Sequence, residues 1–251
     1  MVGDDVKLCN VSIDYGQQSA VRTLSGELAR GALTAIVGAN GAGKSSLLKA
    51  IVGLVPLQCG SIELGDLKRS DLAYLPQQSA LDRSFPLCVG DVVALGDWRR
   101  SGWARAVLSP VRGRVEAALE AVGLPGFAGR TMEELSVGQF QRVLFARMWL
   151  QDAPVLLLDE PFAAVDEATT RALLSIMLAW GRQGRTVIAV LHDLRQVRDN
   201  FTHALMLAGE AVAWGPTPEV FTSANLELAL GIPLGLRGLL RDESVVARSA
   251  A

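Results

Sequence analysis

A glycine-rich loop with the spacing G-x-x-x-x-G-K-S, at residues 38–45, constrains the fold of this chain more than any other feature. A compact apolar run at 33–37 precedes it, and Leu47, Leu48 and Ile51 have the spacing of a helix over 46–54. Glycines let such a loop turn its N–H groups inward around phosphate oxygens, and the helix start adds a favourable dipole. We therefore predict a strand, a phosphate-binding loop and a helix, in preference to a chance glycine-rich turn. The predicted nucleotide-binding residues of this unit are Gly38, Ala39, Asn40, Gly41, Ala42, Gly43, Lys44, Ser45 and Ser46.

Two acids, Asp159 and Glu160, follow a continuous apolar run at 155–158. Such a run is typical of a strand buried on both faces, and carboxylates belong at its solvent-facing end. Beside a phosphate loop, we expect Asp159 to hold Mg²⁺ through water and Glu160 to act as a general base on the attacking water. Lys44 would then reach the β- and γ-phosphates, and the Ser45 hydroxyl would ligate Mg²⁺. A strand that simply ends in a polar turn is the alternative.

His192 is one of only two histidines, and it follows another apolar run at 186–191. A lone histidine is more often structural than catalytic. However, parallel α/β sheets bind ligands at the carboxyl ends of their strands, so the loop, the acids and His192 are predicted to meet on one edge of the sheet. His203 opens a strand-like run instead, and we interpret it as structural.

A second possible anion site precedes a predicted helix at Ser136, Val137, Gly138 and Gln139. The free N–H groups of a helix start and a serine hydroxyl suit an anion. Taken alone, however, this segment reads as a helix-capping sequence.

The pattern of short strands and helices predicts a single α/β domain. Strand-like runs at 6–28, with a turn at Tyr15-Gly16, precede the loop, and further strands are predicted at 61–64, 72–75, 155–158, 186–191 and 204–207. Helical spacing at 89–95, 111–122 and after 136 predicts an inserted helical lobe, and 168–182 predicts another helix. We assign residues 6–78 and 152–215 to the core, 79–151 to the lobe, and 216–251 to a tail with one or two short helices.

Composition excludes several classes of protein. Lysine and arginine number 24 against 26 acids, which gives a net charge of −2 and no overall footprint for nucleic acid. The three scattered cysteines, Cys9, Cys59 and Cys88, indicate neither a disulfide framework nor a zinc ribbon. No signal peptide and no apolar stretch of about 18 residues is visible, so we expect a soluble chain, or one peripheral to a membrane through a partner.

Six motifs in order resemble the nucleotide-binding subunit of an ABC transporter over about residues 6–215. They are the loop at 38–45, Gln77 after Tyr74-Leu75-Pro76, the segment 135–139, the strand and acids at 155–160, Asp166 after 163–165, and His192. The resemblance implies a P-loop nucleotide-binding domain with a parallel-sheet core, an N-terminal antiparallel β region and an inserted helical lobe.

The resemblance also implies roles for individual residues. Tyr15 would stack on adenine, Gln77 would touch Mg²⁺ and sense a transmembrane partner, and His192 would contact the γ-phosphate. A homodimer would form on ATP binding: residues 136–139 of one subunit would close over ATP held by the other, and Asp166 would cross the interface. Val137 stands where the family has glycine, and a β-branched residue is poorly suited to positive φ, so we expect an altered backbone or closure there.

Three segments, at 138–147, 159–166 and 190–194, look like the group that imports zinc or manganese with a periplasmic binding protein. This implies ATP and Mg²⁺ as cofactors, transmembrane permease subunits as partners, an indirect link to an extracytoplasmic metal-binding protein, and a place on the cytoplasmic face of the membrane. Three alternatives stay open: a soluble ATPase of this type acting on nucleic acid, ribosomes or an assembly scaffold, a slow regulatory module, and an importer for another substrate.

The stretch 97–114 is rich in arginine and tryptophan. It is interpreted as a solvated face of the lobe, or as a surface for anionic lipid or nucleic acid. Its residues of interest are Trp98, Arg99, Arg100, Trp103, Arg105, Arg112 and Arg114. For the dock of the membrane partner, the apolar candidates are Phe85, Leu87 and Val89.

Overall fold

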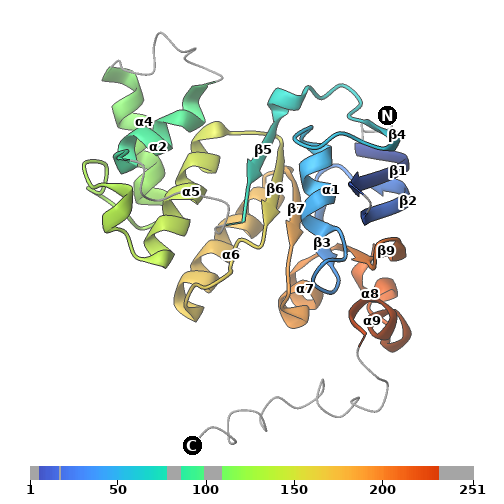
Figure 1. Cartoon of the computed structure of the whole chain (residues 1–251). Helices are drawn as coiled ribbons and strands as arrows, with labels where there is room; N and C mark the ends of the chain where they lie inside the picture. The colour runs from blue at the N-terminus through green and yellow to red at the C-terminus, as the bar shows by residue number, and fades with distance from the viewer. Residues whose placement is uncertain (1–5, 17, 78–85, 99–108, 232–251) are drawn as a thin grey trace, which may run out of the picture.

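A six-stranded sheet forms the centre of the molecule. The structure is a computed structural model, and it describes residues 6–16, 18–77, 86–98 and 109–231. The strand order is β5-β6-β7-β3-β8-β9 (Figure 1). The bounds are Leu72–Leu75 for β5, Val155–Asp159 for β6, Thr186–Val190 for β7, Leu33–Val37 for β3, His203–Leu207 for β8 and Ala211–Pro216 for β9. The predicted parallel core is confirmed for the first five strands, while β9, which was not predicted, runs antiparallel to β8.

Both faces of the sheet are covered, and the side chains of each strand are shared between them. In β6, Leu156 and Leu158 belong to one buried apolar cluster, whereas Val155 and Leu157 belong to another. Successive side chains of a strand point to opposite faces, so one continuous apolar run can serve two cores. This explains why the buried strands read as unbroken apolar segments rather than as alternating ones.

The N-terminal antiparallel sheet is confirmed, with the order β2-β1-β4. Its strands are β1 (Val6–Tyr15), β2 (Gln18–Leu28) and β4 (Cys59–Glu63). It lies on the far side of α1 (Lys44–Ile51) from the helical lobe (Figure 1). Gly26 of β2 lets the Trp214 side chain of β9 approach, since a Cβ there would lie 2.5 Å from the indole ring. The two sheets share a buried apolar cluster, and Gly26 and Trp214 form one tight contact between them.

The remaining helices form the lobe and flank the central sheet. The lobe contains α2 (Val89–Ala94), α4 (Ser109–Ala121), α5 (Val137–Gln151) and the 3₁₀ turns η3 (Leu95–Asp97) and η4 (Met132–Glu134). The other helices are η1 (Arg69–Asp71), α6 (Glu167–Arg182), α7 (Leu194–Asn200), α8 (Thr217–Val220) and α9 (Ser223–Leu230). Among the described residues, no helix is both long enough and apolar enough to cross a membrane.

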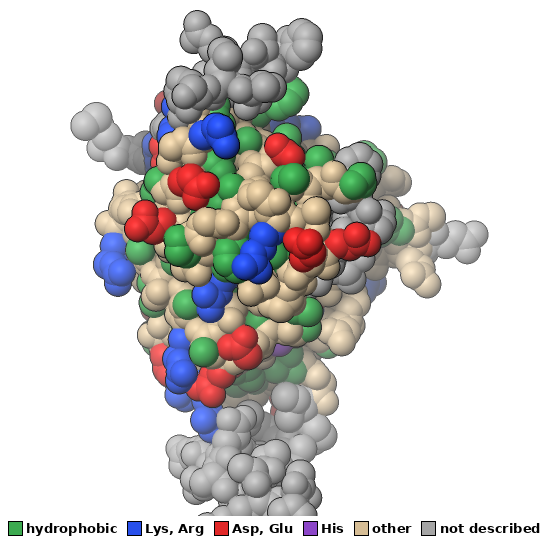
Figure 2. All heavy atoms as spheres, turned by 90° about the vertical axis from the view of Figure 1, so that its left-hand side faces the viewer, with side chains coloured by type: hydrophobic (Ala, Val, Ile, Leu, Met, Phe, Trp, Pro, Cys, Tyr) green, Lys and Arg blue, Asp and Glu red, His purple; other side chains and the backbone are tan. Residues whose placement is uncertain are grey.

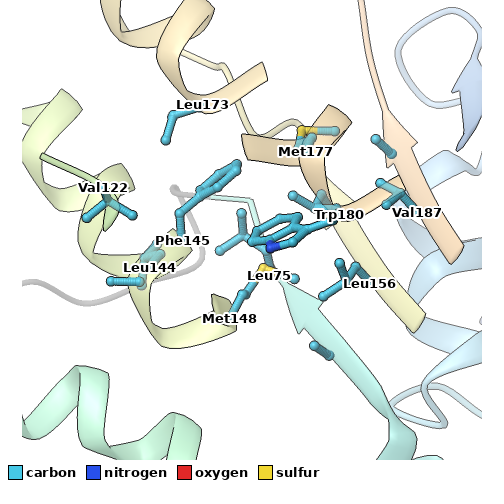
Figure 3. Close-up of a cluster of buried hydrophobic side chains, with 14 of the residues drawn as sticks. Leu75, Val122, Leu144, Phe145, Met148, Leu156, Leu173, Met177, Trp180 and Val187 are labelled. Carbon is cyan, nitrogen blue, oxygen red and sulfur yellow. The ribbon is translucent and has the colours of Figure 1, made fainter. Parts of the chain in front are cut away.

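One buried cluster joins the lobe to the sheet (Figure 3). Phe145 of α5 stacks on Trp180 of α6 with ring centroids 5.6 Å apart and an interplanar angle of 13°. Leu75 of β5 and Leu156 of β6 belong to the same cluster. The lobe and the sheet therefore share one core, and α5 and α6 are packed together through Phe145 and Trp180, the largest fully buried side chains among the described residues.

The expectation that Val89 belongs to the dock of a membrane partner is wrong. Val89 is fully buried in the shared core, because it begins α2 facing α5, so it presents no docking surface. Leu87 is also packed against that core, and Phe85 lies outside the described residues.

The arginine-rich stretch is described only in part. Arg114 forms an ion pair with the buried Asp97. Arg99, Arg100, Trp103 and Arg105 lie outside the described residues, whereas Arg112 and Trp98 are exposed.

The face of the molecule that carries the lobe mixes acidic, basic and apolar side chains (Figure 2). No single sign of charge dominates the part that the structure describes there.

Candidate nucleotide site

The glycine-rich loop connects the end of β3 to the first turn of α1. Gly41 and Gly43 have φ values of 82° and 93°, a left-handed conformation that glycine adopts at little cost. Gly38 is needed for space instead, since a Cβ there would lie 2.1 Å from the carbonyl oxygen of Leu207. The loop is therefore seated directly on the end of β8, with its N–H groups at the start of a helix.

The Lys44 ammonium lies over this loop. Its Nζ donates to the carbonyl oxygens of Gly38 and Ala39, at 2.8 Å each. Burial lowers the pKa of Lys44, while the charges of Glu160 and Asp159 act in the opposite direction. A compact ammonium among backbone dipoles is suited to phosphate oxygens.

Asp159 lies at the end of β6, where two hydroxyl groups meet its carboxylate. Ser45 Oγ donates to Oδ1 at 2.8 Å, and Tyr74 Oη donates to Oδ2 at 3.3 Å. Burial is the main cause of the raised pKa of Asp159, and it also raises the pKa of Tyr74, whose phenol stays neutral and acts as a donor. Tyr74 was not predicted as a residue of the site. Its register opposite Leu157, two residues before Asp159, puts it on the same face of the sheet.

Glu160 is held between two other side chains. Gln77 Nε2 donates to its Oε2 at 2.8 Å, and His192 Nε2 lies 3.0 Å from its Oε1. Because a carboxylate only accepts, Nε2 of His192 must carry the proton in this contact. Glu160 has a φ of 49°, a left-handed backbone that costs a non-glycine residue roughly 1–2 kcal/mol. Gln77, Glu160 and His192 follow β5, β6 and β7, so the expected convergence at one sheet edge is observed.

These groups surround a cavity of about 600 Å³. Its lining residues are Ala20, Asn40, Gly41, Ala42, Gly43, Lys44, Ser45, Ser46, Gln77, Glu160 and His192. Gly38 and Ala39 lie beneath the ammonium, and Asp159 lies behind Ser45. Tyr15 does not line the cavity and is 47% exposed at the β1–β2 turn. Ala20 of β2 was missed, and no pattern in the sequence distinguishes it.

The segment 136–139 does not line this cavity either. Ser136 caps α5: its Oγ accepts from Gln139 N–H at 3.3 Å, and Gln139 Oε1 accepts from Ser136 N–H at 3.0 Å. Asp166 caps α6 in the same way, accepting from Thr169 N–H and Thr169 Oγ1 at 2.8 Å each. These bonds lower the pKa of Asp166.

The starts of α5 and α6 meet at Thr169. Its Oγ1 also accepts from Arg142 at 3.2 Å, and a Cβ on Gly138 would lie 3.2 Å from the same oxygen. Thr169 and Arg142 were not anticipated from the sequence. The segment at 136–139 and Asp166 therefore form one continuous surface, separate from the loop cavity of the same chain.

The expectation of an altered backbone at Val137 is wrong. Val137 begins α5, and it is not among the residues with positive φ. The family glycine at this place is therefore not required by backbone conformation. Gly138 is the tighter position, because it contacts Thr169.

The oxygen donors of the site suit a hard divalent cation. The Ser45 hydroxyl and the Asp159 carboxylate are in direct contact, and the Gln77 amide lies beside Glu160. Hydroxyl, carboxylate and amide oxygens are the ligands that Mg²⁺ prefers, usually together with phosphate and water. The donor set fits Mg²⁺.

Known proteins resemble this chain over most of its length. The family described as ABC transporter matches residues 21–163. The manganese transport system ATP-binding protein MntB of Bacillus subtilis is 39% identical over 230 residues, covering 90% of this chain and 92% of that protein. The zinc transport system ATP-binding protein TroB of Treponema pallidum is 37% identical, covering 90% and 86%.

Solved structures agree with the fold. An inward-facing conformation of a metal-chelate type ABC transporter aligns with a TM-score of 0.80 and 27% identity, covering 90% of this chain and 89% of that one. The dimeric cassette MJ0796, in a post-hydrolysis state bound to ADP and Pi, aligns with a TM-score of 0.73 and 26% identity, covering 84% and 98%.

Proposed function

The chain belongs to the ABC transporter family, and we propose that it is the ATP-hydrolysing subunit of an importer for a divalent transition-metal ion. The observation that supports catalysis most directly is the place of Glu160. Its carboxylate lines the loop cavity and is held at both oxygens by Gln77 and His192.

The loop and Lys44 are proposed to bind the phosphates of ATP. The N–H groups of the loop and of the first turn of α1 would face the phosphate oxygens, whose negative charge the helix dipole favours. Lys44, held over the carbonyl oxygens of Gly38 and Ala39, would reach the β- and γ-phosphates. Ser45, Asp159 and Gln77 would hold Mg²⁺, which neutralises charge on the β- and γ-phosphates when bound.

Glu160 is proposed to act as the general base. A carboxylate at the edge of the cavity can accept the proton of a water aimed at the γ-phosphate. Gln77 and His192 fix the carboxylate plane, which limits the directions from which that water is held. The N–H at Nε2 of His192, which contacts Glu160 in this structure, would donate to a γ-phosphate oxygen when ATP is bound. Tyr15, at the β1–β2 turn, is proposed to stack on adenine.

Hydrolysis is proposed to need two copies of the chain. Ser136, Val137, Gly138 and Gln139 cap α5 away from the loop cavity of their own subunit. In a head-to-tail pair they would cover the ATP of the other subunit, and Asp166 would reach the same interface. A dimer therefore accounts for a second helix start that offers N–H groups without a phosphate loop beside it.

The cargo is proposed to be zinc or manganese, carried by a transmembrane permease that receives it from an extracytoplasmic binding protein. The names of MntB and TroB and the local resemblance at 138–147, 159–166 and 190–194 support this choice. The chain would then act at the cytoplasmic face of the membrane, bound through the permease, with ATP and Mg²⁺ as its own ligands and no nucleic acid partner.

We propose that the permease docks at the cleft beside β5 and η3. This cleft, of about 370 Å³, is lined by Arg69, Trp98 and Arg147, with Leu95 at its edge. Leu95 and Trp98 are 50% and 55% exposed, so the cleft presents two large apolar side chains to a partner. Arg147 donates to the carbonyl oxygen of Tyr74, so the cleft is connected to the strand that leads to Gln77.

The test is an ATPase assay of the chain with its permease in lipid, stimulated by binding protein loaded with Zn²⁺, Mn²⁺ or Fe²⁺. We expect stimulation by one of the first two ions and little by apo binding protein. ATPase activity that responds to RNA or DNA, and not to any loaded binding protein, would overturn the importer assignment.

A further inference from the structure

The C-terminal helix α9 contacts the phosphate loop through the main chain. The N–H of Ala39 donates to the carbonyl oxygen of Ala229 at 3.1 Å. Ala229 is buried, and α9 ends one residue later at Leu230, followed by Gly231 in a left-handed cap. A helix from the tail therefore supplies an acceptor to the loop.

The peptide group between Gly38 and Ala39 is held at both ends. Its carbonyl oxygen, on Gly38, accepts from Lys44 Nζ, and its N–H, on Ala39, donates to Ala229. A peptide group is planar and its C=O and N–H point in opposite directions, so fixing one end orients the other. The bond from α9 thus sets the carbonyl that holds the Lys44 ammonium.

The same helix packs toward the other side of the nucleotide site. Leu226 of α9 and Phe221 line a cavity of about 360 Å³ together with His192 and Asp193. Asp193 caps α7, accepting from the N–H groups of Arg195 and Gln196. One short helix therefore contacts the phosphate loop and approaches the segment that carries His192.

Two side chains stabilise the start of α9 and its junction with α8, without facing the nucleotide. Thr222 Oγ1 accepts from Asn225 N–H at 3.2 Å, which caps the helix. Asn225 Nδ2 donates to the carbonyl oxygen of Val220 at 2.9 Å, which fixes the angle between α8 and α9. Neither residue lines the loop cavity.

We propose that α9 is a positioning element for ATP, which pre-orders the Gly38–Ala39 peptide and with it Lys44. This inference rests on the proposed ATP binding at the loop. If α9 lowers the entropy that the loop loses on binding, then ATP must in return stabilise α9, since coupling between two sites is reciprocal. A helix that only completes the fold would not respond to nucleotide.

The test compares a loosened helix with a matched control. Thr222→Ala combined with Asn225→Ala removes both of these side-chain hydrogen bonds. The control is Leu228→Ala, which changes a 69% exposed side chain on the same helix. We expect the double variant to bind ATP roughly 3- to 10-fold more weakly, as expected for about one lost hydrogen bond. The turnover number at saturating ATP should stay within about twofold, because the binding energy is lost equally in the ground state and the transition state. Leu228→Ala should match wild type.

Amide hydrogen exchange gives a second readout that needs no variant. In the wild-type chain, ATP should slow exchange along α9 as well as at the loop. Unchanged exchange in α9, or unchanged ATP affinity in a folded double variant, would overturn the positioning role. A wild-type chain that binds no ATP would instead overturn the proposed function itself, so the two failures are distinguishable.

Discussion

Oε1 of Glu160 lies 3.0 Å from Nε2 of His192, a contact between residues that follow two neighbouring parallel strands. The strands place the pair, and the left-handed backbone of Glu160 turns its carboxylate into the cavity. Each residue of the pair is therefore positioned by the sheet rather than by a flexible loop, which favours a fixed direction for proton transfer.

Glu160→Gln should abolish hydrolysis while leaving nucleotide binding intact. The amide keeps the size of the carboxylate and one of its two acceptor oxygens, but it cannot accept a proton from water. We expect phosphate release to fall roughly 10²- to 10⁴-fold, as for the loss of a general base. Glu116→Gln, at an exposed acid of α4, is the matched control. Equally slow hydrolysis by wild type and Glu160→Gln would show that the chain is not a catalyst of this kind.

Asp159→Asn should stabilise the nucleotide-free chain at neutral pH and inactivate it. Burial raises the pKa of Asp159, so the folded state holds the proton more tightly than the unfolded state, and ionisation destabilises the fold. The wild type loses stability as pH rises from about 4, the ordinary carboxyl value, through the folded pKa. Melting curves should therefore show a gain for Asp159→Asn that is absent in acid, grows through this window and then stays constant. A gain that is largest in acid would contradict the argument.

Val137→Gly should leave ATP turnover unchanged or raise it. Val137 is a partly exposed first residue of α5 with ordinary helical backbone, so the change removes bulk without relieving strain. The expected cost is at most roughly 0.5–1 kcal/mol of stability, from the greater freedom of glycine. Steady-state ATPase rates measure the effect, and a collapse of activity would show that the valine is required.

Gly138→Val should have the opposite result. Its Cβ would press on the Thr169 hydroxyl, which already bonds Asp166 and Arg142. We expect the variant to melt as a folded protein and to lose most of its turnover, since the surface at 136–139 and Asp166 would shift together. Full activity in this variant would argue against a role for that surface in hydrolysis.

Gly26→Ala should destabilise the contact between the two sheets. The added methyl group would lie 2.5 Å from the Trp214 ring, and overpacking of this kind costs roughly 1–3 kcal/mol. Gly113→Ala, on α4 with open space around it, should be neutral or slightly stabilising. Combining Gly26→Ala with Trp214→Leu should recover part of the loss in chemical denaturation. If the losses in free energy of unfolding from the two single substitutions simply add in the double variant, the contact between Gly26 and Trp214 is not the cause.

The parallel strands could be predicted because they are buried on both faces and leave unbroken apolar runs, as at 155–158 and 186–191. The strand β9 could not, since it is a partly exposed edge that ends in Gly215 and Pro216 and has no alternation. The short helix α7 was also missed, because seven residues carry too little periodicity to stand out.

The candidate site could be anticipated where its residues follow strands, as Gln77, Glu160 and His192 do. Tyr74 required the register of β5 on β6, which no local pattern contains. Thr169 and Ala229 act through contacts between segments far apart in the chain, so only the folded structure brings them to Gly138 and Ala39.

The sharing of β6 between two cores limits how this segment can change in length during evolution. Inserting or deleting one residue would exchange the environments of Val155 and Leu156 and of Leu157 and Leu158, and would move both acids relative to Ser45 and His192. Length variation among relatives should therefore be confined to connections such as the one between β4 and η1, while the odd or even count of residues in β6 before Asp159 stays constant. The alternation of β6 side chains between two cores thus fixes where the two acids stand at the end of the strand.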